Sequence, residues 1–508
     1  MKKNTLLMIF SLIYCYTYTQ SQFMDGEAKR GNNWVMGYNS DTIFSGQEIN
    51  HFIFSANGQL PSVILEERHL ELDAGHSCIS DTSGNLILMT NGYQVHTANN
   101  EVLEDSLGYD ANAYQSYYSM GIPIANGSLI LPYPDHPEQY VVFYYSIKMS
   151  PGDPFLYIKR FYYSVFDMNT KTIVQKDHIL VNDTLAYTGI AATRHANGRD
   201  WWVIIPEAVS NCYYVFLIKP NGTSVSKQCL GRKFRIYNST GQATFSPQGD
   251  KYAVANILNE LDIYNFNRCN GVLSNPLHIP IRADTTVDYV NFLQDVIPYG
   301  VAFSPNNRFL YVGASTQILQ FDLLASDIAN SKLIVADWDS TPPGIPPFPA
   351  FPFGRLKAAP DGRIYIDTNA SLFKMYIDKP DLQGVNCAVN KYGVSHPKYA
   401  RVLPTSVYYG LGRLYGSPCD TLATAKEEGI SKDVKVYPNP VQEILNISFS
   451  DFSTAFNVCF YDILGKKVHE ISLSQASTEI FVGNWAKGAY FYEVSNTKEK
   501  IYGKVFIE

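Results

Sequence analysis

Phe303-Ser-Pro-Asn-Asn-Arg-Phe-Leu-Tyr-Val312 places a proline-led turn directly before a run of apolar and aromatic residues. Proline presets the backbone of the first turn residue, asparagine tolerates the left-handed conformation, and aromatic and β-branched residues favour a strand. The same order recurs at Phe245–Val254 and at Ala358–Ile366. The stretch therefore predicts a turn that leads into a strand, and its recurrence indicates a repeated β-unit.

The recurring turns are evenly spaced along the chain. Pro247 lies 58 residues before Pro305, and Pro305 lies 55 residues before Pro360. A related turn at Ala196–Ile204 begins 51 residues before Pro247. Each blade of a β-propeller is a sheet of about 40–50 residues that must pack against its neighbours. We therefore predict an all-β chain in which residues 22–418 form a seven-bladed β-propeller, with six and eight blades as alternatives.

The predicted ring leads to two further expectations for the chain. The first and last parts of residues 22–418 are expected to share one blade and so close the ring. The turns of the repeat are expected to connect strands of successive blades, with no two of them in one sheet. These turns lie near Gly84, Pro137, Gly198, Gly249, Asn307 and Gly362.

The composition argues against two classes of partner. The chain of 508 residues has 17% charged and 14% aromatic residues, with 37 tyrosines, which suits packed strands. Its formal net charge is −7, and no block of Lys and Arg occurs. Nucleic acids and anionic membranes bind to basic patches. We therefore expect neither partner, and we expect any bound ligand to be neutral.

The N-terminus has the pattern of a secretory signal peptide. Lys2 and Lys3 precede the apolar run Leu6–Tyr14, and polar or small residues follow up to Ser21. We predict a signal peptide at residues 1–21 that directs the chain into the periplasm. A membrane span needs about 18 or more apolar residues. This run is shorter, so we expect no membrane span.

Seven cysteines follow the predicted signal peptide, and they are too scattered for a disulfide framework. Cys212 and Cys229 flank the turn Lys219–Gly222, so they could face each other across a hairpin. A bridge between them and free buried thiols are equally open. No cluster of Cys and His has the spacing of a zinc site. We expect no metal and no cofactor.

The repeat region contains no recognisable catalytic motif. A nucleophile elbow, a phosphate-binding loop and a metalloprotease helix motif are all missing from the sequence, so no catalytic residue is assigned. Arg, His and Trp often line binding surfaces, and four such residues lie close together. These candidate ligand-binding residues are Arg194, His195, Trp201 and Trp202. The alternative is a buried belt of aromatic residues within the blades.

A proline-rich loop offers two more candidate residues. Residues 341–353 contain six prolines, which hold a chain extended. Phe348, Phe351 and Phe353 project from this loop and could meet a sugar ring or a partner chain at little entropic cost, and the first two are assigned as candidates. The alternative is that these rings pack on the rim of the propeller.

A second, smaller β-domain is expected at the end of the chain. Residues 419–433 are polar and indicate an exposed linker. Residues 434–508 alternate short strand-like runs with glycines, which predicts a small Ig-like β-sandwich. Proline is confined to sheet edges and turns. The entry corner of the sandwich would therefore consist of Tyr437, Pro438, Asn439 and Pro440.

Particular residues are assigned to the turns and the core of this sandwich. Three glycines are expected in tight turns, where a side chain would be strained. They are Gly465, Gly488 and Gly503. The aromatic residues expected in its core are Tyr437, Phe460 and Trp485.

Two parts of the chain resemble known families. Phe303–Val312 resembles the outer hairpin of the WD-repeat-like propellers of exported bacterial proteins, and Phe266–Pro276 resembles a segment that recurs in such propellers from Bacteroidota. The motifs of residues 434–508, from Tyr437–Pro440 to Gly503–Ile507, closely resemble the type A C-terminal sorting domain of the type IX secretion system. The first resemblance implies a fold but no activity.

The second resemblance implies a route out of the cell. It implies recognition by the type IX secretion translocon and removal of the domain by a sortase-like surface protease. The protein would then be secreted or held on the outer cell surface. We hypothesise that its propeller binds a glycan or a protein without catalysis. The alternative is a propeller hydrolase or lyase that acts on extracellular polysaccharide.

Overall fold

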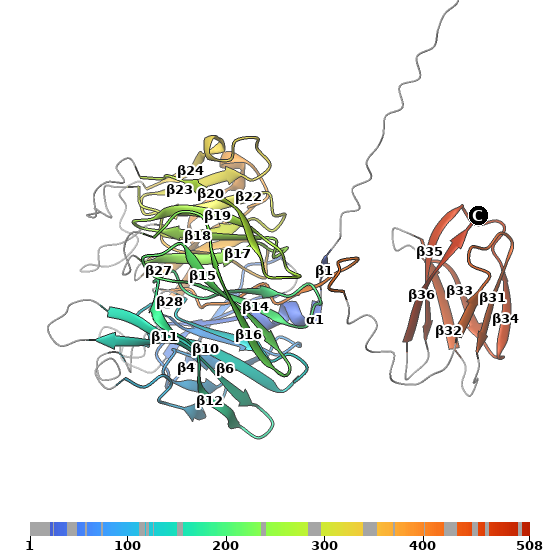
Figure 1. Ribbon diagram of the computed structural model, residues 1–508, viewed down its shortest axis with the longest axis horizontal. Coiled ribbons are helices and arrows are strands. Elements are labelled where there is room, and N and C mark those ends of the chain that lie inside the picture. Colours follow the sequence, from blue (N-terminus) through green and yellow to red (C-terminus); the bar gives the residue numbers. More distant parts are fainter. Residues whose placement is uncertain are drawn as a thin grey trace, which may run out of the picture. The chain divides into compact units, whose positions relative to one another are not determined.

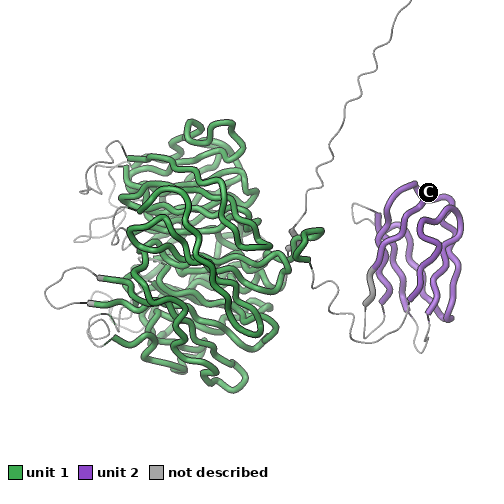
Figure 2. Tube along the Cα trace, in the orientation of Figure 1, with its two compact units in different colours: residues 1–420 green, residues 421–508 purple. Residues whose placement is uncertain are grey.

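The computed structural model divides into two compact units, residues 1–420 and residues 421–508 (Figure 1, Figure 2). Almost all of the described elements are β-strands. The residues that the structure describes are 21–23, 25–37, 48–55, 58–72, 75–110, 117, 121–124, 126–149, 156–234, 240–282, 296–338, 353–368, 371–400, 402–420, 434–449, 456–462, 467–495 and 500–508.

Within the described part of the first unit, seven sheets each use consecutive antiparallel strands (Figure 1). The first sheet has three strands, β2 (Asn33–Met36), β3 (Glu48–Ile53) and β4 (Ser62–Glu67). The next three sheets have four strands each, β5–β8 (Ser77–Ser80, Leu86–Thr90, Val95–Thr97, Val102–Glu104), β9–β12 (Ser128–Pro132, Gln139–Met149, Leu156–Asp167, Thr172–Leu185) and β13–β16 (Ala191–Arg194, Trp201–Pro206, Cys212–Lys219, Gly222–Cys229).

The last three sheets have the same four-stranded plan. They are β17–β20 (Gly241–Phe245, Lys251–Asn256, Glu260–Phe266, Leu273–Ile279), β21–β24 (Gly300–Phe303, Phe309–Ala314, Gln317–Asp322, Leu333–Asp337) and β25–β28 (Leu356–Ala358, Ile364–Ile366, Ser371–Ile377, Val389–Ala400). A separate two-stranded sheet pairs β1 (Ser21–Phe23) with β29 (Leu411–Leu414), so the predicted cleavage site after Ser21 falls inside β1. The short helical elements are α1 (Asp25–Ala28), η1 (Lys29–Gly31), η2 (Ala329–Ser331) and η3 (Gly384–Cys387).

The recurring turns join the first two strands of a sheet. Gly362 and Asn307 have φ angles of +83° and +65°, a conformation that glycine and asparagine tolerate best. The six turns fall between β5 and β6, β9 and β10, β13 and β14, β17 and β18, β21 and β22, and β25 and β26. The prediction that they connect strands of successive blades is therefore wrong, because a tight turn pairs adjacent antiparallel strands. No two of the six turns lie in one sheet.

The first strands of neighbouring sheets lie side by side. β5 contacts β9, β13 contacts β17, β17 contacts β21, and β21 contacts β25. These strands are therefore the innermost ones, and each sheet extends outward from them as a propeller blade does. Phe303–Val312 spans the turn between β21 and β22, so it is an inner hairpin. Its expected outer position is wrong, because local turn chemistry does not reveal which strand faces the axis.

Apolar cores fill the spaces between neighbouring sheets, and one of them joins the last sheet to the first. The ring of Trp34 in β2 lies 5.4 Å from the ring of Tyr365 in β26, centroid to centroid. Phe52 of β3 and Tyr376 of β27 belong to the same buried cluster. The ring of sheets is therefore closed, and the first unit is a β-propeller. The number of its blades stays a prediction.

The end of the first unit completes this closure. The backbone N–H of Leu403 donates to Oδ1 of Asp367, 2.7 Å away, in the last sheet. The N–H of Thr405 donates to the carbonyl oxygen of His76 at 2.8 Å, and Oγ of Ser77 donates to the Thr405 carbonyl oxygen. This segment thus lies between the last sheet and the second one, beside the three-stranded first sheet.

Two disulfides stabilise the propeller. Cys212 and Cys229 stand opposite each other on β15 and β16, and they form a disulfide bond. The structure therefore favours the bridge over free thiols for this pair. A second disulfide, between Cys269 and Cys419, joins residues 150 apart in the sequence. Sequence spacing gave no sign of it, because only the closed ring brings the two residues together.

The second unit is a sandwich of two antiparallel sheets. One sheet has the strand order β30-β31-β34 and the other β33-β32-β35-β36. Their bounds are β30 (Val434–Tyr437), β31 (Ile444–Phe449), β32 (Phe456–Tyr461), β33 (Lys467–Leu473), β34 (Ser477–Phe481), β35 (Gly488–Ser495) and β36 (Lys500–Ile507). One apolar core lies between the sheets. An immunoglobulin-like topology stays a prediction.

The structure agrees with some of the core residues assigned to this sandwich and contradicts another. Phe460 is fully buried, and Trp485 packs against the core. Tyr437 is 48% exposed, so its assignment to the core is wrong. Its strand is at a sheet edge, where one face of a side chain can remain in solvent.

The three glycines assigned to tight turns have different outcomes. Gly488 opens β35 with a φ of +149°, a value that L side chains rarely adopt. Gly503 lies inside β36 opposite Tyr492, so its placement in a turn is wrong. A Cβ at Gly503 would come within 2.2 Å of the Tyr492 ring, which explains the need for glycine there. Gly465 lies outside the described residues.

Candidate functional site

His195 and Trp202, two of the candidate binding residues, are buried by internal contacts. Nε2 of His195 lies 2.9 Å from the carbonyl oxygen of Cys269, and Nδ1 accepts a hydrogen bond from the backbone N–H of Asn197 at 3.0 Å. Burial lowers the pKa of His195, which favours the neutral ring that this pairing requires. Nε1 of Trp202 donates to the carbonyl oxygen of Arg268 at 2.7 Å. A role for either ring in ligand binding stays a prediction.

Arg194 and Trp201 lie in a buried charged cluster beside α1. The Arg194 guanidinium is 4.0 Å from the centre of the Trp201 ring and forms an ion pair with Glu27. Arg30 donates two hydrogen bonds to the same carboxylate, at 2.9 and 3.0 Å. Burial alone would raise the pKa of Glu27, but the hydrogen bonds and charges of the two arginines lower it. Glu27 is therefore a structural carboxylate, and the binding role of Arg194 and Trp201 also stays untested.

The two phenylalanines of the proline-rich loop, Phe348 and Phe351, lie outside the described residues. The last residue of that loop, Phe353, is fully buried, and its N–H donates to the carbonyl oxygen of Ser315. One phenylalanine of the loop thus belongs to the core between two sheets. Binding by the other two stays a prediction.

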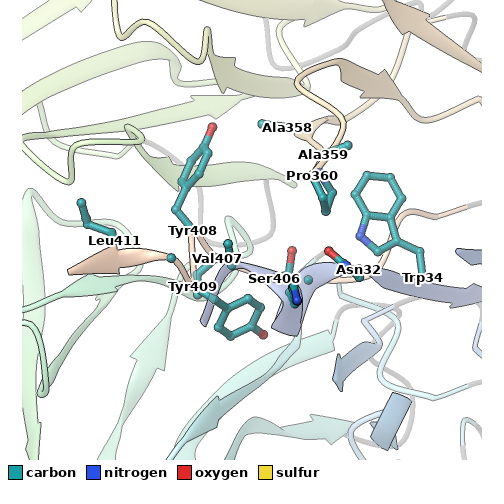
Figure 3. A pocket seen from close by; sticks show the side chains of 14 residues that line it. Asn32, Trp34, Ala358, Ala359, Pro360, Ser406, Val407, Tyr408, Tyr409 and Leu411 are labelled. Atoms are coloured by element: carbon teal, nitrogen blue, oxygen red, sulfur yellow. The ribbon is translucent and has the colours of Figure 1, made fainter. Parts of the chain in front are cut away.

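A pocket of about 570 Å³ lies beside η1, and Figure 3 shows side chains that line it. Three distant segments line it, namely residues 28–34 around η1, residues 358–360 after the innermost strand β25, and residues 406–411. The third segment crosses the middle of the ring. The hydroxyl of Tyr409 donates to the carbonyl oxygen of Ile130 in β9, and Leu411 reaches the β17–β18 turn at Gly249. We call this feature the axial pocket.

Close backbone packing positions the walls of the axial pocket. A Cβ at Gly410 would lie 2.8 Å from Cβ of Ala28, so the C-terminal segment passes directly against α1 only because residue 410 is glycine. The neighbouring Tyr409 is 2% exposed and packs edge-on against Trp201 at 6.2 Å. Both Tyr409 and the adjacent, less buried Tyr408 line the pocket.

The axial pocket combines aromatic surface with polar groups. Figure 3 shows the rings of Tyr408 and Trp34 on either side of Pro360, with Asn32 and Ser406 nearby. Burial raises the pKa of Tyr408, so its hydroxyl stays protonated at neutral pH. Pro360 is exposed, and the pocket opens to solvent on that side. Such a mixture of flat apolar faces and a few polar groups is typical of ligand sites.

The described lining of the pocket contains no acidic, imidazole or thiol side chain. None of the 14 described residues that line it is Asp, Glu, His or Cys. In the described part of the chain, no group of three or more such residues lies close enough together to hold a metal ion. The described helices include none long and apolar enough to cross a membrane. The described lining of the pocket thus has donors, acceptors and aromatic side chains, but it has no carboxyl group.

The Tyr-Pro-Asn-Pro corner of the second unit covers the edge of the last strand. Nδ2 of Asn439 donates to the carbonyl oxygen of Lys504, and Oδ1 accepts from the N–H of Phe506, both at 2.9 Å. The flanking residues Pro438 and Pro440 have no N–H to offer. The Asn439 amide therefore makes the hydrogen bonds that backbone groups make elsewhere in a sheet, and it fixes the corner on β36.

The comparisons with known proteins find one family. Residues 435–508 match the secretion system C-terminal sorting domain. A comparison with curated proteins finds no match. The solved structures similar to this chain include a putative 6-phosphogluconolactonase from Bacteroides uniformis, with 10% identity, coverage of 73% of this chain and 96% of that chain, and a TM-score of 0.39. A protein from Lactobacillus plantarum shares 11% identity over 88% of this chain and 99% of that chain, with a TM-score of 0.34.

A third solved structure is the Dos1 propeller, with 12% identity over 75% of this chain and 97% of that chain and a TM-score of 0.36. None of these weak structural likenesses bears on the activity of this chain. The family match is different in kind, because it spans the whole sandwich, including the corner that Asn439 fixes on β36. Residues 435–508 are therefore a C-terminal sorting domain, and the chain is a cargo of the type IX secretion system.

Proposed function

We propose that the propeller is an exported binding module that holds a glycan in its axial pocket and leaves it chemically unchanged. The predicted signal peptide would bring the chain to the periplasm, and the sorting domain would take it across the outer membrane. A sortase-like surface protease would then remove the sorting domain. The propeller would act outside the cell, free or attached to the surface.

One observation carries this proposal, namely the set of side chains in the axial pocket. Tyr408 supplies an aromatic face, the nearly buried Trp34 forms part of the wall, and Asn32 and Ser406 supply hydrogen-bonding groups. A sugar ring has apolar faces and a polar periphery, so it matches this arrangement in both respects. The pocket is also built from three segments that the ring closure holds rigidly, and little conformational entropy is lost when such a site binds its ligand.

The same residues argue against the hydrolase or lyase alternative. Most glycoside hydrolases need two carboxyl groups about 5–10 Å apart on either side of the scissile bond. A lyase needs a base within reach of the proton that it removes. The described lining of the axial pocket supplies no carboxyl group. Its candidate bases are Lys29 and Tyr408, and burial raises the pKa of Tyr408, which disfavours the phenolate that a base would need. Binding without turnover is therefore the function that this site supports best.

Replacement of Tyr408 by alanine should weaken glycan binding about tenfold or more, or about 1.4 kcal/mol. The change removes an aromatic face and a hydroxyl group from the pocket without touching the buried Tyr409. Tyr415→Ala is the matched control, because Tyr415 is 48% exposed and does not line the pocket. The native chain would first be screened on a glycan array, and the affinities of both variants for the best ligand would then be measured by calorimetry.

Two results would contradict the proposal. Equal loss of affinity in the Tyr408 and Tyr415 variants would show that the ligand binds elsewhere. Release of new reducing ends from the bound glycan by the purified native chain, and not by a heat-denatured sample, would show that the propeller is an enzyme.

A further inference from the structure

The polar groups of the axial pocket are not used by the protein itself. Five of its residues have side-chain donors or acceptors that make no hydrogen bond or ion pair with any described residue. They are Lys29, Asn32, Trp34, Ser406 and Tyr408. Buried polar groups in folded proteins are normally hydrogen-bonded. Of the five residues only Trp34 is buried, so its unused N–H is the one that calls for a partner, and the four partly exposed groups beside it are free to bind the same ligand.

Trp34 gives the sharpest evidence. Trp34 is only 1% exposed, yet its indole N–H has no hydrogen-bond partner among the described residues. Figure 3 shows the indole nitrogen on the side of the ring that faces Asn32, within the group of side chains that line the pocket. An indole N–H can only donate a hydrogen bond. A buried donor without an acceptor costs about 1–3 kcal/mol, and an acceptor on a ligand would remove that cost.

The pocket also has an uncompensated positive charge. Among the described residues that line it, Lys29 is the one charged residue, and none is a carboxylate. The nearest acidic residue along the chain, Glu27, is already paired with Arg30 and Arg194. Nζ of Lys357 is 4.4 Å from the centre of the Trp34 ring, but burial lowers the pKa of this amine to about 7, so Lys29 is the main source of positive charge. The ammonium group, the indole N–H and two hydroxyl groups together favour a ligand that accepts hydrogen bonds and is negatively charged.

We infer that the axial pocket binds a sugar residue that bears a carboxylate, with Lys29 pairing to that carboxylate and Tyr408 lying against the ring. This inference rests on the proposed function and narrows its ligand to acidic glycans. An ionised carboxylate only accepts hydrogen bonds, and its bonds to charged donors are about twice as strong as neutral ones. The net charge of −7 favours a neutral ligand. The charge of the whole chain, however, does not determine the sign of the charge inside one pocket.

The test compares oligouronates with their neutral counterparts on the full-length protein. The probes are tetragalacturonate, tetramannuronate and a hyaluronan tetrasaccharide, each paired with its carboxyl-reduced form. We expect the native chain to bind at least one acid form tenfold or more tighter than its reduced form. Lys29→Gln should bring that ratio close to one, and Lys29→Arg should keep most of it. Lys233→Gln, the same charge change at an exposed lysine outside the pocket, should leave the ratio unchanged.

The outcomes separate this inference from the function on which it rests. Reduced or other neutral glycans could bind as tightly as the acid forms, with a lower affinity in the Tyr408→Ala variant. In that case the pocket binds glycans, but the inferred specificity for acidic sugars is wrong. Binding of sulfated oligosaccharides in place of uronates would also overturn the inference. If no glycan of either kind binds, the proposed function falls with it. Circular dichroism melting of each variant excludes loss of binding through unfolding.

Discussion

A chain that ends at Ser431 should remain inside the cell envelope, whereas the full-length chain should appear outside the cell. The sorting domain begins at residue 435, so this truncation removes all of it. The propeller keeps every one of its described sheets and both disulfides, the last of which ends at Cys419. We therefore expect a folded propeller that accumulates in the periplasm, with less than about one tenth of the native amount in the medium and on the surface.

Cell fractionation and immunoblotting would measure this distribution in a host with a functional type IX system. Trypsin resistance of the trapped fragment would show that the propeller is folded, which separates failed export from failed folding. A host without the secretion system serves as the control, since the full-length chain should be trapped there in the same way. Equal amounts of truncated and full-length chain outside the competent host would refute the assignment.

Replacement of Phe460 by alanine should unfold the sorting domain and block export without affecting the propeller. Phe460 is fully buried, and its ring lies 5.2 Å from that of Trp485 and 6.0 Å from that of Tyr492. Removal of a buried phenylalanine ring costs about 3–5 kcal/mol. A domain of this size is stabilised by only about 4–11 kcal/mol, so the loss removes much of its stability.

Calorimetry of the full chain should show two transitions, and only the one that belongs to the sorting domain should move in the Phe460 variant. Phe481→Ala is the matched control, because Phe481 is 62% exposed on β34 of the same domain. It should leave both transitions and the exported amount nearly unchanged. An unchanged sorting-domain transition in the Phe460 variant would show that this ring does not support the core as we describe it.

The fold could be predicted from local signals because its repeat is local. The turn at Asn307 has the left-handed backbone that asparagine tolerates, and the strand that follows it is apolar on both faces. The Cys212–Cys229 bridge could be suggested from the sequence for the same reason, because a single hairpin determines which residues of β15 and β16 face each other. What the sequence could not reveal was the place of each hairpin in the ring. That depends on contacts between first strands, such as β17 with β21, which lie far apart along the chain.

The binding site could not be predicted because closure of the ring creates it. Lys29, Pro360 and Tyr408 come from opposite ends of the propeller sequence, and no motif relates them. The sequence favours Arg194 and His195 as ligand-binding residues because they lie close to two tryptophans along the chain. Their partners Glu27 and Cys269 are remote, and only the structure shows that both side chains are already engaged. A buried tryptophan with an unpaired N–H also leaves no mark in a sequence.

The central claim is that the chain is a type IX cargo whose sorting signal lies in the terminal domain. The most direct test transfers that domain to another protein. Residues 419–508 would be fused to a neutral periplasmic reporter, and its location would be followed by immunoblotting in competent and secretion-deficient hosts. The account predicts that the fused reporter leaves the competent host only, and that the Phe460→Ala form of the fusion stays inside. A fused reporter that remains in the periplasm of the competent host, like the reporter alone, would contradict it.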